Sequence, residues 1–589
     1  MANVYWFGGT NNWSNAGSWS NNSGNSPASL HGSVPGADDS VIFDTLSSAA
    51  EAAYTVTVDA AATCKDFTMD GPSATDATKV TWAGTFALAV SGSLNLSGGT
   101  AGITLSYTGD LTFNATSGTQ VVTSNSLTFL SNIIHNGTGG TLQLADSMII
   151  GGAKGFTNTA GTFDATTNTT TVTFNGTAHT ITPTTAITFY NLTRTPASAA
   201  KTSTLTLAGN ITVSNLFTVS NGATVTNRVL VLSSLIGTPK TITAESNAIT
   251  NADFKDIVGA GDADWDLRTI TGLSGDCGGN DGITFTPVVT QYWYKASGAA
   301  NNWSTVGNWY LGTGGSGGAG RVPLPQDTAI LDDLSFGAGG MTLTQDMPRI
   351  PTTTFLGVDG AHAVTNVPTF TTSTAASVFG SLTLASSTLM TLTASTQTYY
   401  FEGRDVGMPV GGWTLTSGVG NTWAKIIYTA VFGATFILLD DYNSTANLTP
   451  LNGTLDLNDK NVTVNIFSNN TATGARTLMM GSGLYTLNSS IGGTVWTMAA
   501  IVDFQAETST IKITGTDNNA ITFAGGARTY NNVWFSRGAS TASNTISSNN
   551  TFNDFKDDGS EAHSLLVTVG TTQIVNTFTV SGTAGKLIT

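Results

Sequence analysis

The stretch TVTFNGTAHTITPTTAITFYN, residues 171–191, contains the pattern that decides the fold. Val172 and Phe174 flank a Thr, and fifteen residues later Ile187 and Phe189 flank another. An apolar residue at every second position predicts a β-strand with one buried face. The Gly, Asn and Thr residues between the two triplets predict turns.

The same triplet, in which two apolar residues flank one residue that is usually polar, recurs along the chain. In the first half the apolar pairs are Leu94 and Leu96, Leu111 and Phe113, Leu127 and Phe129, Leu142 and Leu144, and Leu205 and Leu207. In the second half they are Leu382 and Leu384, Trp413 and Leu415, Leu455 and Leu457, Trp496 and Met498, Ile511 and Ile513, and Ile521 and Phe523.

The spacing of the triplets favours stacked coils. Successive triplets are usually about 15 to 20 residues apart, which fits one triplet in each coil of a β-solenoid whose coils stack on one another. A tandem of β-sandwiches, the alternative, needs strands at shorter intervals of roughly 8 to 12 residues. We therefore expect an all-β protein made of elongated, parallel β-helix-like solenoid units.

Composition supports this fold class and limits the function. Of 589 residues 10% are charged, 40% are hydrophobic and 67 are Gly, so long helices and wholesale disorder are not expected. The net charge of −16 opposes binding to nucleic acid or to an anionic membrane surface. No apolar run reaches the roughly 20 residues that span a bilayer, and the start MANVYWFGG lacks signal-peptide features. Cys64 and Cys277 are too few for a disulfide framework, and we expect two unlinked thiols.

A Trp-rich segment occurs twice and indicates a tandem of two related units. YWFGGTNNWSNAGSW from Tyr5 and VPGADDSVIFD from Val34 recur as YWYKASGAANNWSTVGNW from Tyr292 and VPLPQDTAILD from Val322. The matched residues are Tyr5, Trp6, Trp13, Trp19, Pro35, Asp39 and Asp44 in the first copy, and Tyr292, Trp293, Trp303, Trp309, Pro323, Asp327 and Asp332 in the second. Each unit spans roughly 288 residues by this offset.

This duplication predicts five segments. They are a Trp-rich β cap at 1–70, a β-rich repeat region at 71–230, an end segment at 231–288, a second Trp-rich β cap at 289–360, and a second repeat region at 361–589. Two later matches extend the duplication: residues 174–191 match 513–531, and FTVS at 217–220 matches FTVS at 578–581. The chain ends eight residues after the second FTVS, so we expect a cap, a partner or an oligomer at the last coil.

Together with YTVTVD at 54–59 and SGDCGGNDGITF at 274–285, the Trp-rich segments resemble the repetitive tail-fibre and adhesin-like virion proteins of bacteriophages, particularly marine ones. The specific resemblance covers about 45 residues per unit. It implies a role on the virion surface or tail, exposed outside the cell after release, and it brings no catalytic residues to transfer.

The candidate site residues belong to the Trp-rich segments. Exposed faces of Trp13, Trp19, Trp303 and Trp309 would stack on a cell-surface glycan; the alternative, which we favour, is that they plug the end of each solenoid. Tyr5, Trp6, Pro35, Asp39 and Asp44, with Tyr292, Trp293, Pro323, Asp327 and Asp332, form a structural motif. Within it, Asp39 and Asp327 are expected to cap turns.

Metal and catalytic motifs are weak. GDADWD at 261–266, DCGGND at 276–281 and DLNDKN at 456–461 cluster oxygen ligands, but none fits an EF-hand, so calcium remains an alternative to the absence of any cofactor. His31, His135, His179, His362 and His563 are isolated and are expected at the surface. The most carboxylate-rich aromatic region, Glu402, Asp405, Asp440 and Asp441, is the candidate for the paired carboxylates of a polysaccharide depolymerase.

The sequence therefore predicts a non-catalytic phage virion protein, a tail or head fibre or a surface decoration, that displays host-attachment surfaces. Its expected partners are other virion proteins, further copies of itself and host cell-surface glycan. The alternatives are a tailspike-type depolymerase and a bacterial secreted adhesin or filament subunit.

Overall fold

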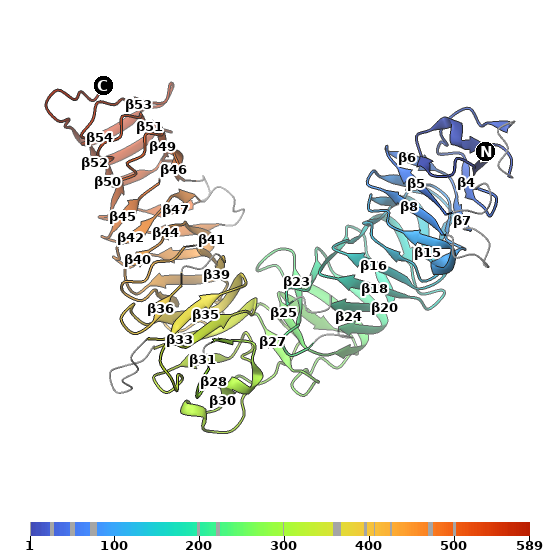
Figure 1. Ribbon diagram of the computed structural model, residues 1–589, viewed down its shortest axis with the longest axis horizontal. Helices are drawn as coiled ribbons and strands as arrows, with labels where there is room; N and C mark the ends of the chain where they lie inside the picture. The colour runs from blue at the N-terminus through green and yellow to red at the C-terminus, as the bar shows by residue number, and fades with distance from the viewer. Residues whose placement is uncertain are drawn as a thin grey trace. The chain divides into compact units, whose positions relative to one another are not determined.

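The computed structural model describes residues 2–23, 29–47, 53–70, 79–196, 201–219, 224–298, 300–356, 367–393, 397–405, 407–424, 427–468, 475–489, 491–498 and 502–589. The chain is 51% strand and 3% helix, and its strands form parallel stacked coils, a β-solenoid of about 20 turns (Figure 1). The predicted solenoid is confirmed. The β-sandwich alternative is wrong, because nearly all strand pairs run parallel from one coil to the next.

The chain divides into two compact units, Met1–Thr286 and Pro287–Thr589. The finer division into five segments stays a prediction.

Unit 1 contains three sheets among its described residues. The largest comprises β1 (Asn3–Trp6), β3 (Trp19–Ser20), β4 (Ser40–Phe43), β6 (Ala62–Cys64), β7 (Phe67–Met69), β9 (Leu88–Val90), β10 (Leu94–Asn95), β12 (Leu111–Phe113), β13 (Thr119–Thr123), β15 (Ile133–Leu144), β17 (Phe156–Asp164), β19 (Ala178–Pro183), β21 (Thr204–Leu207), β23 (Val229–Ser233), β25 (Ala252–Lys255) and β27 (Ser274–Asp276). The second comprises β2 (Asn11–Asn12), β5 (Tyr54–Val58), β8 (Val80–Gly84) and β11 (Ile103–Leu105). The third comprises β14 (Thr128–Phe129), β16 (Met148–Gly152), β18 (Thr171–Gly176), β20 (Thr188–Pro196), β22 (Ile211–Val219), β24 (Lys240–Ile249) and β26 (Ile257–Ala260). Unit 1 also has a short helix, α1 (Gly99–Gly102), and a 3-10 turn, η1 (Ala16–Ser18).

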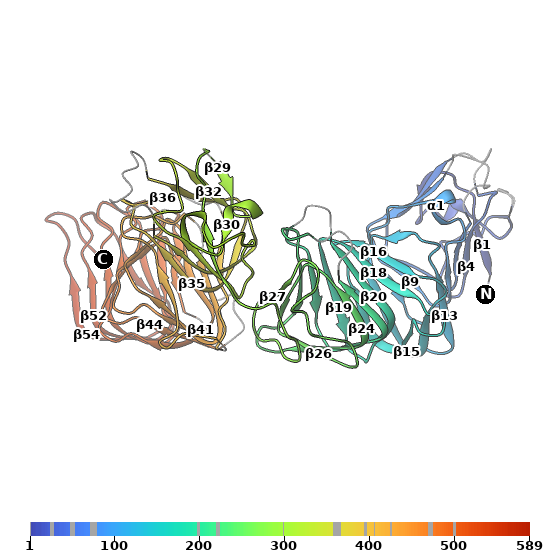
Figure 2. The same cartoon turned by 90° about the horizontal axis from the view of Figure 1, so that it is seen from below.

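Unit 2 contains four sheets among its described residues. The largest comprises β28 (Thr290–Trp293), β30 (Trp309–Tyr310), β31 (Thr328–Leu331), β33 (Arg349–Phe355), β35 (Ala376–Leu384), β37 (Tyr399–Phe401), β38 (Trp413–Thr416), β39 (Ile427–Leu438), β41 (Leu448–Asp456), β44 (Arg476–Met479) and β47 (Val502–Gln505). A short sheet of β29 (Ala300–Asn302), β32 (Thr342–Gln345), β34 (Thr369–Thr372) and β36 (Thr391–Leu392) lies to one side, apart from β41 and β44 (Figure 2).

The later coils of unit 2 contribute its other two sheets. One comprises β40 (Tyr442–Asn443), β42 (Val462–Val464), β45 (Leu484–Leu487), β48 (Thr510–Ile513), β50 (Thr529–Phe535), β52 (Asn550–Asp557) and β54 (Gln573–Val580). The other comprises β43 (Phe467–Ser468), β46 (Gly493–Thr497), β49 (Ile521–Ala524), β51 (Asn544–Ser547) and β53 (Leu565–Val567). The 3-10 turns η4 (Val306–Asn308) and η5 (Thr313–Gly315) flank β30.

The apolar triplets form the core of each unit. Every apolar residue of the predicted pairs is at most 9% exposed, and most are fully buried. The residue between the two apolar positions faces outward, as in β12, where Thr112 is half-buried between Leu111 and Phe113. Burial of one face at every second residue is what holds each coil on its neighbour.

The prediction of one triplet per coil holds where Leu382 pairs with Leu415 of the next triplet, but it does not hold along the whole chain. One coil runs from a strand to its partner in the same sheet, and this takes 20 residues from Thr171 to Asn191 and 33 from Leu382 to Leu415. A coil therefore contains strands of more than one sheet, and successive triplets can lie in different sheets of one coil, as those on β48 and β49 do.

The two FTVS stretches lie one coil apart when the two units are aligned on their matched tyrosines. The first FTV lies on β22, which pairs directly with β20, whereas the second lies on β54, two strands beyond β50. Since β20 and β50 contain the matched Tyr190 and Tyr530, the two FTVS stretches do not occupy equivalent coils.

A bulged pair of long strands does occupy equivalent places in the two units. The pairing of β15 with β17 shifts register between Asn136 and Thr141, and that of β39 with β41 shifts between Ala430 and Thr435. The bulges require glycine in the left-handed region, with φ of 87° at Gly139 and 66° at Gly433.

Several other predictions can be judged here. Cys64 and Cys277 are both buried and no disulfide joins them, which confirms two unlinked thiols. Among the described residues no helix is long and apolar enough to cross a membrane. The last strand, β54, exposes 60% of Phe578, and the cap, partner or oligomer expected at this coil stays a prediction.

Candidate functional site

The tryptophans of each Trp-rich segment form a cluster in the first coil of their unit. In unit 1 the Trp19 indole N–H donates to the Trp13 carbonyl at 2.9 Å, and the two rings meet edge to face with centroids 4.9 Å apart. Trp6 packs against Trp19 at 4.8 Å. In unit 2 Trp309 donates to the Trp303 carbonyl at 2.7 Å, with ring centroids 4.8 Å apart.

Burial corrects the glycan-stacking hypothesis for these tryptophans. Trp13, Trp19, Trp303 and Trp309 are at most 1% exposed, so no ring face is open to a sugar in the folded chain. The clusters instead plug one end of each largest sheet, where β3 and β30 pair antiparallel with β1 and β28 as the final strands. Tyr5 on β1 and Tyr292 on β28 are half-buried, next to buried Trp6 and Trp293.

The aspartates after the two prolines cap turns, as expected. Asp39 accepts from the Gly36 backbone N–H at 3.0 Å, and Asp327 accepts from that of Leu324 at 2.8 Å. Pro35 and Pro323 are buried beside these turns. Arg321 also donates to Asp327 at 2.6 Å in unit 2.

Asp44 and Asp332 close a second, matching turn. Asp44 accepts from the Leu46 backbone N–H at 2.9 Å, and Asp332 accepts from that of Leu334 at 3.1 Å. Each aspartate also receives a hydroxyl from the serine three residues later, at 3.2 Å in both units. The second oxygens of Asp44 and Asp332 accept from the hydroxyls of Ser23 and Thr313, so both carboxylates bind other parts of the chain, which supports a structural role for the motif.

A serine and a distant aspartate, missed by the sequence analysis, fasten the Trp13 and Trp303 turns. Ser14 donates its backbone N–H and its hydroxyl to Asp59 at 3.0 and 2.6 Å. Ser304 does the same with Asp346 at 2.9 and 2.6 Å. The aspartates follow the serines by 45 and 42 residues, so no local pattern in the sequence indicates the pair.

Buried arginines, also missed, hold backbone carbonyls inside the coils. Arg194 is fully buried and donates to the carbonyls of Gly176 at 2.8 Å and Thr177 at 3.0 Å. Burial lowers the pKa of its guanidinium to about 10. Arg537 is 2% exposed and donates to the carbonyls of Gly515 and Asp517 at 3.0 and 2.8 Å. A single arginine thus satisfies several carbonyls that a turn leaves unpaired.

Three of the histidines expected at the surface are buried, so that prediction is wrong for them. His135, His179 and His563 are at most 6% exposed and bond to Asn158, to the Lys154 carbonyl and to Asp557, respectively. Each satisfies a polar group within the solenoid. His31 is partly exposed beside Asp39, and His362 lies outside the described residues.

Two of the four candidate catalytic carboxylates are bound to neighbouring coils. Asp440 accepts from the backbone N–H groups of Ser417 and Gly418 at 2.7 and 2.8 Å. Asp441 accepts from the backbone and side chain of Asn461 at 2.8 and 3.0 Å. These bonds give both aspartates a role in joining coils.

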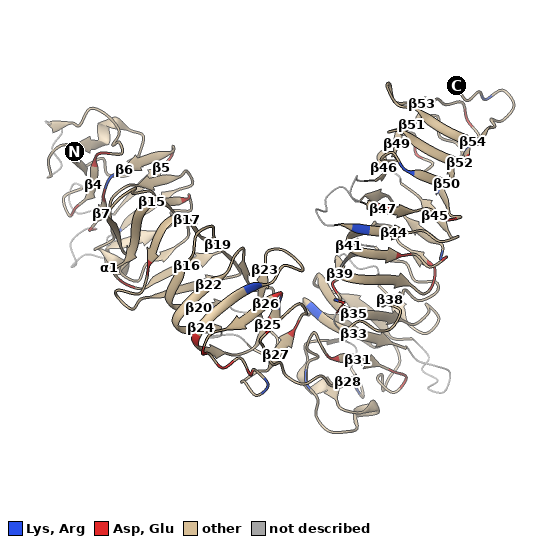
Figure 3. Cartoon of the chain, turned by 180° about the vertical axis from the view of Figure 1, so that it is seen from behind, with Lys and Arg blue, Asp and Glu red and all other residues tan. Residues whose placement is uncertain are grey.

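The calcium hypothesis gains no support from the described residues, which contain no group of three or more His, Cys, Asp or Glu able to hold a metal. In the predicted clusters, Asp276 accepts from Gly278 and Asn280, and Asp266 pairs with Arg268. Asp456 accepts from the backbone N–H of Asn458. Charged residues are few and scattered over the ribbon of each unit (Figure 3).

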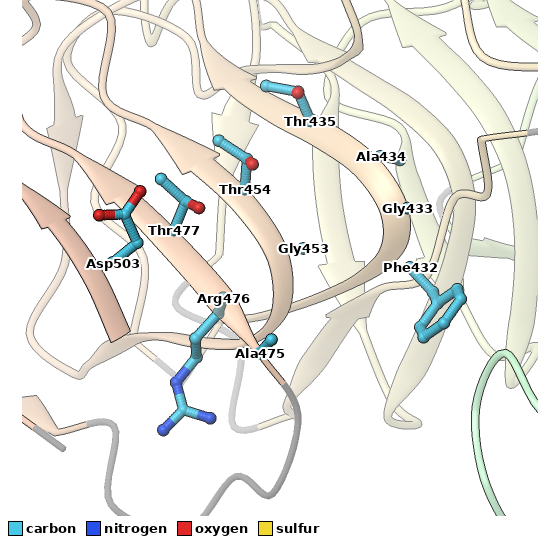
Figure 4. Close-up of a pocket in the computed structure, with 10 residues that line it drawn as sticks. All are labelled: Phe432, Gly433, Ala434, Thr435, Gly453, Thr454, Ala475, Arg476, Thr477 and Asp503. Carbon is cyan, nitrogen blue, oxygen red and sulfur yellow. The ribbon is translucent and has the colours of Figure 1, made fainter. Parts of the chain in front are cut away.

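The described part of unit 2 has an open hollow of about 450 Å³ on the outer face of its largest sheet. It begins at Phe432, on the bulge of β39, and crosses β41 and β44 to Asp503 on β47 (Figure 4). We call it the unit 2 groove. Such a volume is within the range of small-molecule binding pockets.

A row of polar side chains runs along the unit 2 groove. Thr435, Thr454, Thr477 and Asp503 are paired in register on four consecutive strands. Their side chains lie side by side in Figure 4, and the guanidinium of Arg476 points away from them. Phe432 is 40% exposed, and the Arg404 guanidinium lies 5.6 Å from its ring centroid.

The groove adjoins the acidic and aromatic region singled out in the sequence. The backbones of Arg404 and Phe432 form an isolated parallel β-bridge. Gly433 lies so close to Asp405 that a Cβ added to the glycine would be 3.3 Å from the carboxylate carbon of Asp405. The unit 2 groove therefore lies next to this region, although none of its four candidate carboxylates lines the groove.

The fold and the sites define a parallel β-solenoid protein built from two units with the same buried Trp cluster. Comparisons with protein-family models, with curated proteins and with solved structures find no match to this chain.

Proposed function

We propose that the chain is a non-catalytic structural protein of a bacteriophage particle, a tail or head fibre or a surface decoration, that displays host-attachment surfaces. It would lie on the virion surface and be exposed outside the cell after release. Its partners would be other virion proteins, further copies of itself and host cell-surface glycan, and not nucleic acid.

The observation that carries this proposal is the kind of surface that the solenoid presents. Rows of hydroxyls stand in register on rigid strands, such as Thr173, Thr193 and Thr218 on β18, β20 and β22. A continuous apolar core fixes these strands, so the outer rows form a stiff, uncharged and repetitive face. This surface suits display better than chemistry that needs a deep, closed site.

The bonding of Asp440 and Asp441 also favours display over polysaccharide cleavage. A glycosidase needs one carboxyl group to protonate the leaving oxygen and a second to act as nucleophile or base. Both oxygens of Asp440 accept backbone N–H groups, and those of Asp441 accept both donors of Asn461. Such bonds occupy these oxygens and hold each carboxylate in place as a structural link between coils.

The experiment is quantitative mass spectrometry of particles purified by density gradient, combined with a reducing-end assay on host capsule using the purified chain. The proposal predicts the chain in fixed stoichiometry with the other virion proteins and no release of reducing ends. Absence of the chain from particles would overturn it and favour an adhesin or filament subunit. Release of reducing ends would identify a depolymerase instead.

A further inference from the structure

We propose that the unit 2 groove binds an oligosaccharide of neutral or amino sugars, two to three residues long. This deepens the proposed attachment function, on which its biological role rests, by naming one site and its class of ligand. The binding chemistry itself stands on the geometry of the groove.

The dimensions of the groove fit a short chain of sugar rings. Thr435 to Asp503 spans four strands, and strands in a sheet are about 4.8 Å apart, so the row is roughly 14 Å long. One strand spacing is close to the length of one pyranose residue. The hydroxyls of Thr435, Thr454 and Thr477 therefore meet successive sugars at similar positions.

The groups along the row suit a polyhydroxylated ligand. A threonine hydroxyl both donates and accepts, which matches the hydroxyls of a sugar. Because threonine is β-branched, its side chain is stiff on a strand and loses little entropy on binding. Phe432, at one end, offers an aromatic surface for the apolar face of a sugar ring.

Asp503 sets the charge preference. Of the residues that line the groove it is the one charged side chain that is exposed, since Arg476 is 3% exposed. Its carboxylate accepts from sugar hydroxyls or pairs with an amino sugar, and it repels a uronate or a sulfated sugar.

Unit 1 provides a built-in contrast. Thr141 and Thr162 are paired on its bulged strands as Thr435 and Thr454 are in unit 2. The exposed Thr138, however, lies at the bulge position that Phe432 occupies in unit 2. The hydroxyl pair is thus shared, whereas the aromatic end of the groove is specific to unit 2.

The experiment measures binding of the full chain to an array of neutral, amino and acidic oligosaccharides. We expect a neutral or amino-sugar ligand of at least two residues. Thr454→Val and Thr477→Val, which keep the β-branched shape, should each weaken binding about 3- to 10-fold through loss of one hydrogen bond. The matched control Thr162→Val in unit 1 should leave affinity unchanged.

The charge preference is tested with Asp503→Asn, which should raise binding of uronate-containing oligosaccharides relative to neutral ones. The inference is overturned if the chain binds no saccharide, if Thr162→Val weakens binding as much as Thr454→Val, or if wild type prefers acidic sugars. Failure here would leave the chain's presence on particles unaffected, so it is distinguishable from failure of the proposed function.

Discussion

The indole N–H of Trp19 donates to the backbone carbonyl of Trp13, and the same bond recurs between Trp309 and Trp303 in the second unit. The two units thus share a specific buried contact as well as a sequence motif. In both, it stands at the final, antiparallel strand of the largest sheet. This makes the Trp cluster the structural plug from which each stack of coils extends.

Replacing Trp19 with Phe should destabilise the first coils of unit 1. The change removes the indole N–H and leaves a cavity around a fully buried side chain, which should cost roughly 2 to 4 kcal/mol. Hydrogen exchange should quicken in β1 and β4 and stay unchanged in β28 and β31. The matched variant Trp309→Phe should quicken exchange in β28 and β31 and leave β1 and β4 unchanged. Unaltered exchange of β1 in Trp19→Phe would contradict the structural role of the Trp cluster.

Replacing Arg194 with Met should be among the most damaging single changes. It leaves several buried carbonyls without donors, and at about 1 to 3 kcal/mol for each unpaired group the change should cost about 3 kcal/mol or more. The control Arg268→Met removes a side chain that is 55% exposed and should leave the denaturant midpoint nearly unchanged. Denaturant midpoints compare the two. Equal midpoints would show that the carbonyls find other donors.

His179 should make the protein less stable in acid. Burial lowers the pKa of its imidazole to about 4 in the folded chain, against about 6.5 when unfolded. As the pH falls from 6.5 to 4, the unfolded chain gains a proton that the folded chain does not. The free energy of unfolding should fall by about 3 kcal/mol over this window and no further below it.

His179→Gln isolates this contribution. The pKa of His135 is also lowered by burial, and its effect is present in both wild type and variant. The variant's unfolding free energy should therefore fall less steeply between pH 6.5 and pH 4 than that of wild type. Equal slopes would refute the assignment to His179.

Neither cysteine should react with a thiol reagent while the chain is folded. Cys64 and Cys277 are at most 1% exposed, and burial raises the pKa of the Cys64 thiol, which disfavours the reactive thiolate. A colorimetric disulfide reagent should label no thiol in buffer and two in guanidinium. Rapid labelling of the folded chain, or none after denaturation, would count against this picture.

Much of the fold was predictable because β-structure imposes a local period. Leu142 and Leu144 are two residues apart, so their side chains lie on the same face of the strand, and that face is buried whichever sheet the strand joins. The length of a coil was not predictable, since its turns are made of the same Gly, Asn and Thr residues whether the chain turns a corner or completes a circuit. For the same reason the sequence match of the two FTVS stretches suggested equivalent coils, whereas the stretches lie on β22 and β54, which are not equivalent.

The candidate site was less predictable because the residues that form it are joined by register. Thr454 and Thr477 are neighbours only because β41 and β44 pair, and each looks alone like any other threonine. The tryptophans gave a strong signal, but composition does not distinguish a buried aromatic cluster from an exposed one. Arg194 and Asp59 gave no local signal at all.

The most direct test of the central claim is immunogold electron microscopy of phage particles from infected cells, with antibody raised against the purified chain. The proposed virion role predicts gold at one repeated position on intact particles, on the tail or on the capsid surface. Gold confined to free filaments or to the bacterial surface, with particles unlabelled, would contradict it.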